Sequence, residues 1–365
     1  MFKVLTIKGG VRRGRLKTPH GLLATPFFMP DATRGFVKLT ANDDVRRSGT
    51  AALVVNTFHL YLQPGLKIIR RAGGLHRFMD WPGPLLSDSG GFQVFSLIHK
   101  NPGMGRITDE KVIFRSPLDG SRHELTPEKS IRIQFELGTD MMVCLDDCPP
   151  NDFSRPQLEI AVGRTIDWAK RCRREYDKQL KKRGLSATKR PLLFAVIQGG
   201  AELDLRERCA RELIKIGFDG YGFGARPVDK AGKFLEEVLR RTANFIPPTA
   251  LRFALGVGTP EDIRRCARLG WDMFDCVIPT REGRHGKLFL PGAGLSYQTI
   301  NIKNARFSRD LAAVSGRSRL LELKNNSRAY LHHLFRLGEP LGQQLASLNN
   351  LEFYQNWLNK VAARK

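Results

Sequence analysis

Eight short apolar runs recur along the 365-residue chain, and most of them end in a polar or glycine-rich tip. They occupy residues 23–30, 51–57, 83–91, 141–148, 192–200, 219–224, 252–258 and 272–280. The runs do not alternate between apolar and polar residues, which is typical of strands that are buried on both faces of a sheet. Helical patterns separate most of the runs, so the sequence predicts strands and helices in alternation.

Two of these helical patterns carry clear start and stop signals. The segments 126–138 and 259–270 both begin with a Thr-Pro pair and both end in glycine. Threonine is a preferred N-terminal cap, proline fits the first helical position, and glycine commonly follows the last one. Eight buried strands alternating with helices predict a (β/α)8 TIM barrel, and a doubly wound open sheet is the alternative.

The charge of the chain points to a polyanionic partner. Sixty Lys and Arg residues against 36 Asp and Glu residues give a formal net charge of +24. Such a field attracts nucleic acid, and this reading is favoured over a general adaptation for solubility. No apolar run reaches the roughly 20 residues of a membrane helix, and the first residues lack the features of a secretory signal. The six cysteines form no C-x-x-C pair, so we expect a reduced, cytoplasmic protein without a membrane partner.

The ends of the predicted strands carry unusual polar residues. Asp88 ends the third run, Asp146 the fourth and Gln198 the fifth, while Asp275 lies inside the eighth. The stretch LLSDSGGFQ around Asp88 would by itself favour a turn, because Asp, Ser and Gly are common turn residues. In a barrel, however, the carboxyl ends of the strands meet at one mouth, where catalytic groups lie.

Asp275 is unusual because it lies within the apolar stretch MFDCVIPTR. A carboxylate there must be paired, hydrogen-bonded or functional, and a structural role in capping a neighbouring loop is the alternative. Together with Asp88 it forms a candidate carboxylate pair for glycosyl chemistry. In such a pair one group attacks the anomeric carbon, and the other handles the proton of the leaving group.

Ten segments, among them LLSDSGGFQVFSL and DMFDCVIPTREGRHGKLF, closely resemble one known family. They are residues 27–40, 54–65, 85–97, 125–150, 194–200, 207–221, 255–263, 272–289, 301–311 and 327–339. In these segments the chain resembles the tRNA-guanine transglycosylase (queuine tRNA-ribosyltransferase) family, bacterial type, over nearly its whole length. The resemblance implies a (β/α)8 barrel. It also implies one domain over residues 1–365, in which residues 301–365 are a C-terminal helical subregion packed on the barrel.

The resemblance implies base exchange in tRNA. A member of this family is a pentosyltransferase of queuosine biosynthesis: it replaces the wobble guanine of an anticodon by a deazaguanine, without ATP. Asp275 matches the nucleophile that attacks the ribose, and Asp88 matches the general acid and base. The family also implies a homodimer.

The resemblance further implies two sets of binding residues. Arg281 and Arg284 match positions that hold the anticodon nucleotides. The positions that bind the base are Ser89, Phe92, Asp146, Cys148, Gln198, Gly224, Ala225, Val228 and Leu255. Among them Ser89 and Cys148 match the lining of the pocket, and Phe92 matches a ring that stacks on the base.

The loop after the sixth run departs from the bacterial pattern. Residues 224–229 read Gly-Ala-Arg-Pro-Val-Asp, where the bacterial pattern is G-G-L-A-V-G. Cys148 and Val228 still favour an aminomethyl-deazaguanine over queuine as the incoming base. Arg226 opposes this prediction, because a cation near the ammonium group would repel it.

The second departure concerns metal binding. The family binds a structural zinc ion with C-x-C-x-x-C and a later histidine. In this chain those four positions hold Ser318, Leu320, Leu323 and Asn349. Because all four ligands are replaced together, we expect a protein without zinc or any other cofactor. We expect Leu320, Leu321 and Leu323 to bury their side chains where the metal would lie and to hold the helices after Asn326.

Two other functions remain open at this point. One is a non-catalytic partner subunit that binds tRNA and supports an active homologue. The other is a transglycosylase that acts on DNA. The presence of both Asp88 and Asp275 speaks against the first, and Arg281 with Arg284 favours an anticodon loop over DNA.

Overall fold

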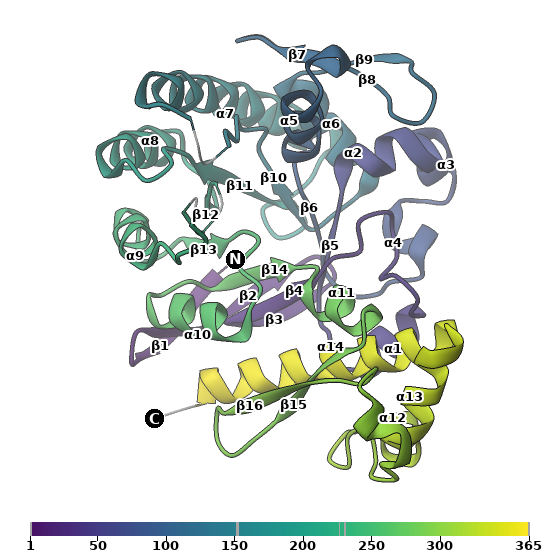
Figure 1. Cartoon of the computed structure of the whole chain (residues 1–365). Helices are drawn as coiled ribbons and strands as arrows, with labels where there is room; N and C mark the ends of the chain where they lie inside the picture. The colour runs from purple at the N-terminus through teal and green to yellow at the C-terminus, as the bar shows by residue number, and fades with distance from the viewer. Residues whose placement is uncertain (1, 151–152, 226, 230, 364–365) are drawn as a thin grey trace.

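The computed structural model describes residues 2–150, 153–225, 227–229 and 231–363. Its centre is a sheet of eight parallel strands in the order β4-β14-β13-β12-β11-β10-β6-β5. A parallel bridge between Asp31 and Val54 joins the two ends of this sheet, and the Ala32 N–H donates to the Val54 carbonyl at 2.7 Å. The sheet is therefore closed, so the predicted (β/α)8 barrel is confirmed and the open sheet is wrong (Figure 1).

Each barrel strand overlaps one of the eight predicted apolar runs. The barrel strands are β4 (Phe27–Pro30), β5 (Leu53–Val55), β6 (Leu85–Ser87), β10 (Met141–Val143), β11 (Leu192–Ile197), β12 (Gly220–Phe223), β13 (Leu251–Ala254) and β14 (Met273–Cys276). Three antiparallel sheets flank the barrel. They consist of β1 (Phe2–Lys8), β2 (Val11–Thr18) and β3 (Gly21–Thr25); β7 (Gly105–Ile107), β8 (Val112–Arg115) and β9 (Arg122–Leu125); and β15 (Lys287–Pro291) and β16 (Tyr297–Asn301).

Helices surround the barrel and also form the C-terminal part of the chain (Figure 1). They are α1 (Asn42–Arg47), α2 (Thr57–Leu60), α3 (Leu66–Arg71), α4 (Leu75–Met79), α5 (Gly91–Lys100), α6 (Pro127–Leu137), α7 (Arg155–Arg183), α8 (Leu203–Ile216), α9 (Glu236–Phe245), α10 (Pro260–Arg268), α11 (Ile278–Arg284), α12 (Leu321–Asn325), α13 (Arg328–Leu337) and α14 (Pro340–Ala363). The predicted caps are present, since the Thr126 and Thr259 side chains accept hydrogen bonds from the third residues of α6 and α10. None of the helices in the described ranges combines the length and the apolar character needed to cross a membrane.

Inside the barrel, side chains alternate strictly between lumen and shell. On β4, Phe27 and Met29 point into the lumen cluster, while Phe28 packs with the helices outside. The same period of two holds on the neighbouring strands, as expected for a strand whose successive side chains point to opposite faces. Leu16 and Leu23, from the sheet of β1–β3, join the lumen cluster and close the base of the barrel.

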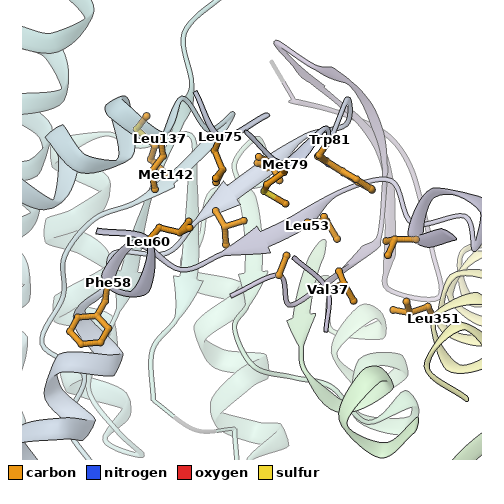
Figure 2. Packing of buried hydrophobic residues seen from close by; sticks show 14 of the residues in the cluster. Val37, Leu53, Phe58, Leu60, Leu75, Met79, Trp81, Leu137, Met142 and Leu351 are labelled. Carbon is orange, nitrogen blue, oxygen red and sulfur yellow. The ribbon is translucent and has the colours of Figure 1, made fainter. Parts of the chain in front are cut away.

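The last helix, α14, packs across the barrel beside its first strands. Figure 2 shows Leu351 of α14 near Val37 and Leu53, within one buried apolar cluster. Two hydrogen bonds fix the helix further: Gln355 Nε2 donates to the Phe28 carbonyl at 3.2 Å, and Tyr354 Oη donates to the Gly258 carbonyl at 2.7 Å. The C-terminal residues therefore contact β4 and the loop after β13, both of which lead to the barrel mouth.

At the base of the barrel, two histidines share one buried carboxylate. Asp140 Oδ1 accepts from the His20 backbone N–H and lies 2.9 Å from His20 Nδ1; Oδ2 accepts from the Leu85 N–H and lies 3.1 Å from His76 Nε2. Although burial opposes it, these hydrogen bonds lower the pKa of Asp140 to about 2. These four contacts occupy both oxygens of Asp140, so the carboxylate joins His20, His76 and Leu85 and needs no cation.

Candidate active site at the barrel mouth

The alternation along the strands brings polar side chains into one layer at the mouth. On seven of the eight strands, all except β10, the inward position that follows the lumen residues lies at or just beyond the carboxyl end. These positions are Asp31 (β4), Asn56 (β5), Asp88 (β6), Gln198 (β11), Gly224 (β12), Leu255 (β13) and Asp275 (β14). The same phase that buries the apolar residues therefore gathers the candidate site.

Asp88 is held by a set of hydrogen-bond donors. Oδ1 accepts from the backbone N–H groups of Thr57 at 2.9 Å and Gly90 at 3.1 Å. Oδ2 accepts from the amide groups of Asn56 and Gln93. These donors fix the direction of the carboxylate and stabilise its ionised form, so Asp88 can both lose and regain a proton without moving.

Asp275 receives less support than Asp88. Its Oδ1 accepts from the Gly256 backbone N–H at 2.9 Å. Burial, together with the charges of Asp31 and Asp88, raises the pKa of Asp275 to about 7. Burial and the charge of Asp31 also raise the pKa of Asp88 to about 7. Both carboxyl groups therefore titrate near neutral pH, where an ionised nucleophile and a protonated acid can coexist.

A second carboxylate–amide pair follows β10 and β11, which lie across the barrel from β14 and β4. Gln198 Nε2 donates to Asp146 Oδ2 at 2.6 Å, and Gln198 Oε1 is buried without a hydrogen-bond partner among the described residues. Burial raises the pKa of Asp146 to about 7. An orphaned buried acceptor is costly unless a ligand satisfies it. The pair thus offers acceptors to the N–H groups of a bound base.

Gly224 allows this pair to form. A Cβ atom at Gly224 would lie 2.4 Å from Gln198 Cδ. The backbone cannot withdraw easily, because the Gly224 N–H donates to the Ile197 carbonyl and Arg206 donates to the Gly224 carbonyl, both at 2.9 Å. Only glycine fits at this position while Gln198 keeps its place.

The remaining base-binding candidates differ in burial and in their contacts. Ser89 is buried, whereas Phe92, on the first turn of α5, is 55% exposed and can therefore stack on a ligand. Cys148 is hydrogen-bonded by the Ala225 backbone, and burial raises its pKa to about 12, so it is a neutral thiol. Ala225 has a φ of 74°, which is unusual for a residue other than glycine. Val228 pairs with Phe234 in an antiparallel bridge.

Arg226, the cation that sequence reasoning placed in this loop, lies outside the described residues. Arg281 and Arg284 lie on α11, which begins directly after β14. Arg281 is about half exposed and Arg284 is half-buried. Burial and the charge of Arg281 lower the pKa of Arg284, while Asp31 opposes that shift. Both cations therefore lie on the helix that follows β14 at the mouth, and Arg284 is near enough to Asp31 to interact with its charge.

The chain is similar to known proteins over nearly its whole length. A family model described as Queuine tRNA-ribosyltransferase matches residues 8–364. The chain belongs to this family. It is 41% identical over 350 residues to a queuine tRNA-ribosyltransferase of Halothermothrix orenii, covering 96% of this chain and 89% of that protein. It is 40% identical over 360 residues to one of Aliivibrio fischeri, covering 99% and 92% respectively. The predicted family and the predicted enzyme class, a pentosyltransferase, are confirmed.

The positions where the queuine tRNA-ribosyltransferase family is expected to bind zinc have other partners in this chain. Ser318 Oγ donates to Glu352 Oε2, and the Arg319 N–H donates to Oε1 at 2.7 Å. Asn349 Nδ2 donates to the Phe289 carbonyl at 3.0 Å. Leu320 and Leu323 are buried in the same apolar cluster as Leu351. Two leucines, a bound hydroxyl and a bound amide do not fit tetrahedral zinc.

One detail of the predicted replacement is wrong. Leu321, which we expected to be buried with its neighbours, is 65% exposed. It is the first residue of α12, and the helical turn directs Leu320 and Leu323 inward and Leu321 outward. Two leucines thus provide the apolar contacts, and hydrogen bonds to the Glu352 carboxylate join residues 318–319 to α14.

Sequence reasoning missed three residues of the mouth: Asp31, Asn56 and Gln93. Asn56 and Gln93 are ordinary polar residues in the sequence, and their role becomes visible only through their hydrogen bonds to Asp88. Asp31 carried a signal, because it lies two residues after Met29 and directly follows the first apolar run. The predicted catalytic positions lie at strand ends, and the described base-binding positions lie at strand ends, on the loops that follow them or, for Phe92, on the first turn of α5.

Proposed function

We propose that the chain exchanges the wobble guanine of target tRNA anticodons for a deazaguanine through a covalent Asp275–ribose intermediate. The carboxylate pair of Asp88 and Asp275, with pKa values near 7 in one layer of the mouth, carries this proposal. Membership of the queuine tRNA-ribosyltransferase family supports it.

In the first half of the reaction, an Asp275 oxygen forms a bond to the ribose C1′ atom as the bond from C1′ to guanine breaks. The electrons of that bond pass to the purine, and protonated Asp88 gives the purine a proton. The four donors that surround Asp88 stabilise the carboxylate that results. In the second half, the incoming base gives a proton to Asp88 and attacks C1′, and Asp275 leaves as a carboxylate. Every bond broken is replaced, so ATP is not needed.

The base pocket accounts for recognition in the same proposal. Asp146 and Gln198 accept N–H groups from the edge of the base, and the exposed ring of Phe92 stacks on its face. Cys148 and Val228 favour the aminomethyl-deazaguanine as the incoming base over queuine. Ser89, Gly224, Ala225 and Leu255 complete the pocket wall.

The charge of the chain supports an RNA substrate. A net charge of +24 attracts the phosphates of tRNA, and in this proposal Arg281 and Arg284 on α11 bind nucleotides around the target. The target base must leave its stack to reach the mouth. A homodimer and a cytoplasmic location stay predictions from the family and from the cysteine content.

The test is exchange of labelled guanine into bulk tRNA, with DNA as a second substrate. Asp275→Asn should lower the rate by several orders of magnitude and abolish the covalent RNA adduct seen on denaturing gels. Asp43→Asn, an equal change of charge on exposed helix α1, should leave both unchanged. Normal turnover by the Asp275 variant would refute the assignment. A wild-type protein that binds tRNA without exchange would instead indicate a partner subunit, and exchange into DNA alone would indicate the DNA enzyme.

A further inference from the structure

Asp31 is a third carboxylate in the mouth. It follows β4, the strand between β14 and β5 in the closed barrel. On one side, Met29 pairs with Asp275 in the parallel ladder. On the other side, Asp31 itself bridges to Val54, two residues before the Asn56 that holds Asp88. Asp31 therefore lies on the rim between the proposed nucleophile and the clamp of the proposed acid.

The direction of its side chain follows from the phase of the strand. Phe27 and Met29 point into the lumen, so the next inward position is Asp31. The Thr33 hydroxyl donates to Asp31 Oδ1 at 2.7 Å. No Lys or Arg among the described residues forms an ion pair with this half-buried carboxylate, since Arg284 acts on it only from a longer distance. Most of its capacity to accept hydrogen bonds therefore remains for a ligand.

A carboxylate at this place has an electrostatic cost for the reaction. The charge of Asp31 raises the pKa of both Asp88 and Asp275, after burial, and so disfavours the ionised nucleophile. In the described part of the chain, Thr33 alone supplies hydrogen bonds to Asp31. This single partner stabilises the fold too little to explain why a carboxylate stands at this position. A role toward the substrate explains the residue better.

The substrate group that reaches Asp31 is the sugar of the target nucleotide. Its C1′ atom must lie against Asp275, and neighbouring strands lie about 4.8 Å apart, the scale of one ribose ring. In an RNA chain the 3′ and 5′ oxygens are esterified, so the 2′-hydroxyl is the free donor of that ring. An ionised carboxylate can only accept, which matches this donor.

We propose that Asp31 accepts a hydrogen bond from the 2′-hydroxyl of the target nucleotide and thereby selects RNA over DNA. This inference rests on the proposed function, because it uses the position of the sugar over Asp275. Hydrogen bonds to the 2-hydroxyl of a sugar strengthen as the glycosidic bond breaks. The 2′-hydroxyl is also the group by which a protein distinguishes the two nucleic acids.

The experiment compares two anticodon stem-loops that differ in one atom. Both are RNA, and one carries 2′-deoxyguanosine at the target position only. The wild-type protein should prefer the ribose substrate in kcat/KM by about 10–100-fold, the range of a hydrogen bond to a charged group. Asp31→Ala should lower this preference to within about threefold, by losing activity on the ribose substrate. Asp43→Asn should keep the wild-type preference.

The ratio of the two substrates isolates the contact. Removing the charge of Asp31 also changes the ionisation of Asp88 and Asp275, but that change affects both substrates equally and cancels in the ratio. Asp31→Asn keeps the size of the side chain and replaces Asp31→Ala as the test if that variant does not fold. Its preference for the ribose substrate should be smaller than that of the wild type. An unchanged ratio in both variants, or no preference in the wild type, would overturn the proposal.

Binding of the two stem-loops, measured by fluorescence anisotropy, separates this inference from the proposed function. If the wild type exchanges no guanine but binds the ribose stem-loop more tightly than the deoxy one, and Asp31→Ala removes the difference, only the catalytic proposal fails. If the wild type exchanges guanine but binds and turns over both stem-loops equally, only the role of Asp31 fails.

Discussion

Replacing Gly224 by alanine should damage both the stability and the base affinity of the protein. The new Cβ atom would lie 2.4 Å from Gln198 Cδ, 2.5 Å from Nε2 and 2.6 Å from Oε1, well inside van der Waals contact. Gln198 is fully buried, and two hydrogen bonds hold the Gly224 backbone, so the amide must leave its position. Its 2.6 Å hydrogen bond to Asp146 is then lost.

The expected cost combines two effects. Overpacking a tight interior costs about 1–3 kcal/mol. The loss of a hydrogen bond to a carboxylate costs about 1.5–3 kcal/mol more. We therefore expect the free energy of unfolding in urea to fall by about 3–5 kcal/mol. Calorimetric affinity for the deazaguanine should fall at least about tenfold, because each 1.4 kcal/mol corresponds to a factor of ten.

Two further variants test the cause of this loss. Gly163→Ala is the matched control, because a Cβ atom at Gly163 in α7 meets nothing within 4 Å. It should stabilise the protein by about 0.5–1 kcal/mol through helix propensity. Adding Gln198→Ala to Gly224→Ala removes the clash and should recover only the overpacking part of the lost stability, without recovering base affinity, because the hydrogen bond to Asp146 stays absent. A Gly224→Ala protein with wild-type stability and affinity would refute the described packing of β11 against β12.

Two more predictions concern charge and metal. Burial raises the pKa of Asp275 to about 7, so the folded state loses stability as the pH rises from the pKa of the unfolded chain, near 4, to about 7. Asp275→Asn should therefore raise the free energy of unfolding in urea by about 1–4 kcal/mol at pH 8, and this increase should shrink toward pH 5. A difference that is constant with pH would contradict the raised pKa. The melting temperature should not change when a chelator is added, and protein purified without a metal-binding tag should hold well under one zinc per chain. Glu352→Gln should lower the melting temperature, because Ser318 and Arg319 donate hydrogen bonds to that carboxylate. Stoichiometric zinc at this place would show that the ligand positions are misassigned.

The sequence predicted the features that depend on local order. The caps at Thr126 and Thr259 act within their own helices, and each apolar run became a strand because burial on both faces requires continuous apolar sequence. Asp88 and Asp275 could be predicted as site residues for a similar reason. A polar residue at the end of an apolar run reaches the mouth of any barrel built from such runs.

The features that the sequence did not reveal depend on contacts between distant residues. Asp31 becomes significant only once β4 is known to lie between β14 and β5, which follows from closure of the sheet. Helix α9 begins only at Glu236, because Phe234 first pairs with Val228 in a bridge. Leu321 is exposed because the phase of α12 is set by contacts with the C-terminal helices. No local pattern encodes the last two outcomes, and none reveals that Asp31 lies beside the strands of Asp88 and Asp275.

The alternation of the strands also limits how such a site can change during evolution. Asp31, Asn56, Asp88, Gln198 and Asp275 each occupy the last inward position of their own strand. A point substitution can therefore exchange one group, as at Asp31, and leave the seven other strands as they are. A one-residue insertion or deletion within a strand would do the opposite: it would turn the reactive group outward and an apolar side chain into the mouth. New specificities should accordingly arise by replacement at fixed positions, while changes of length should be confined to the loops.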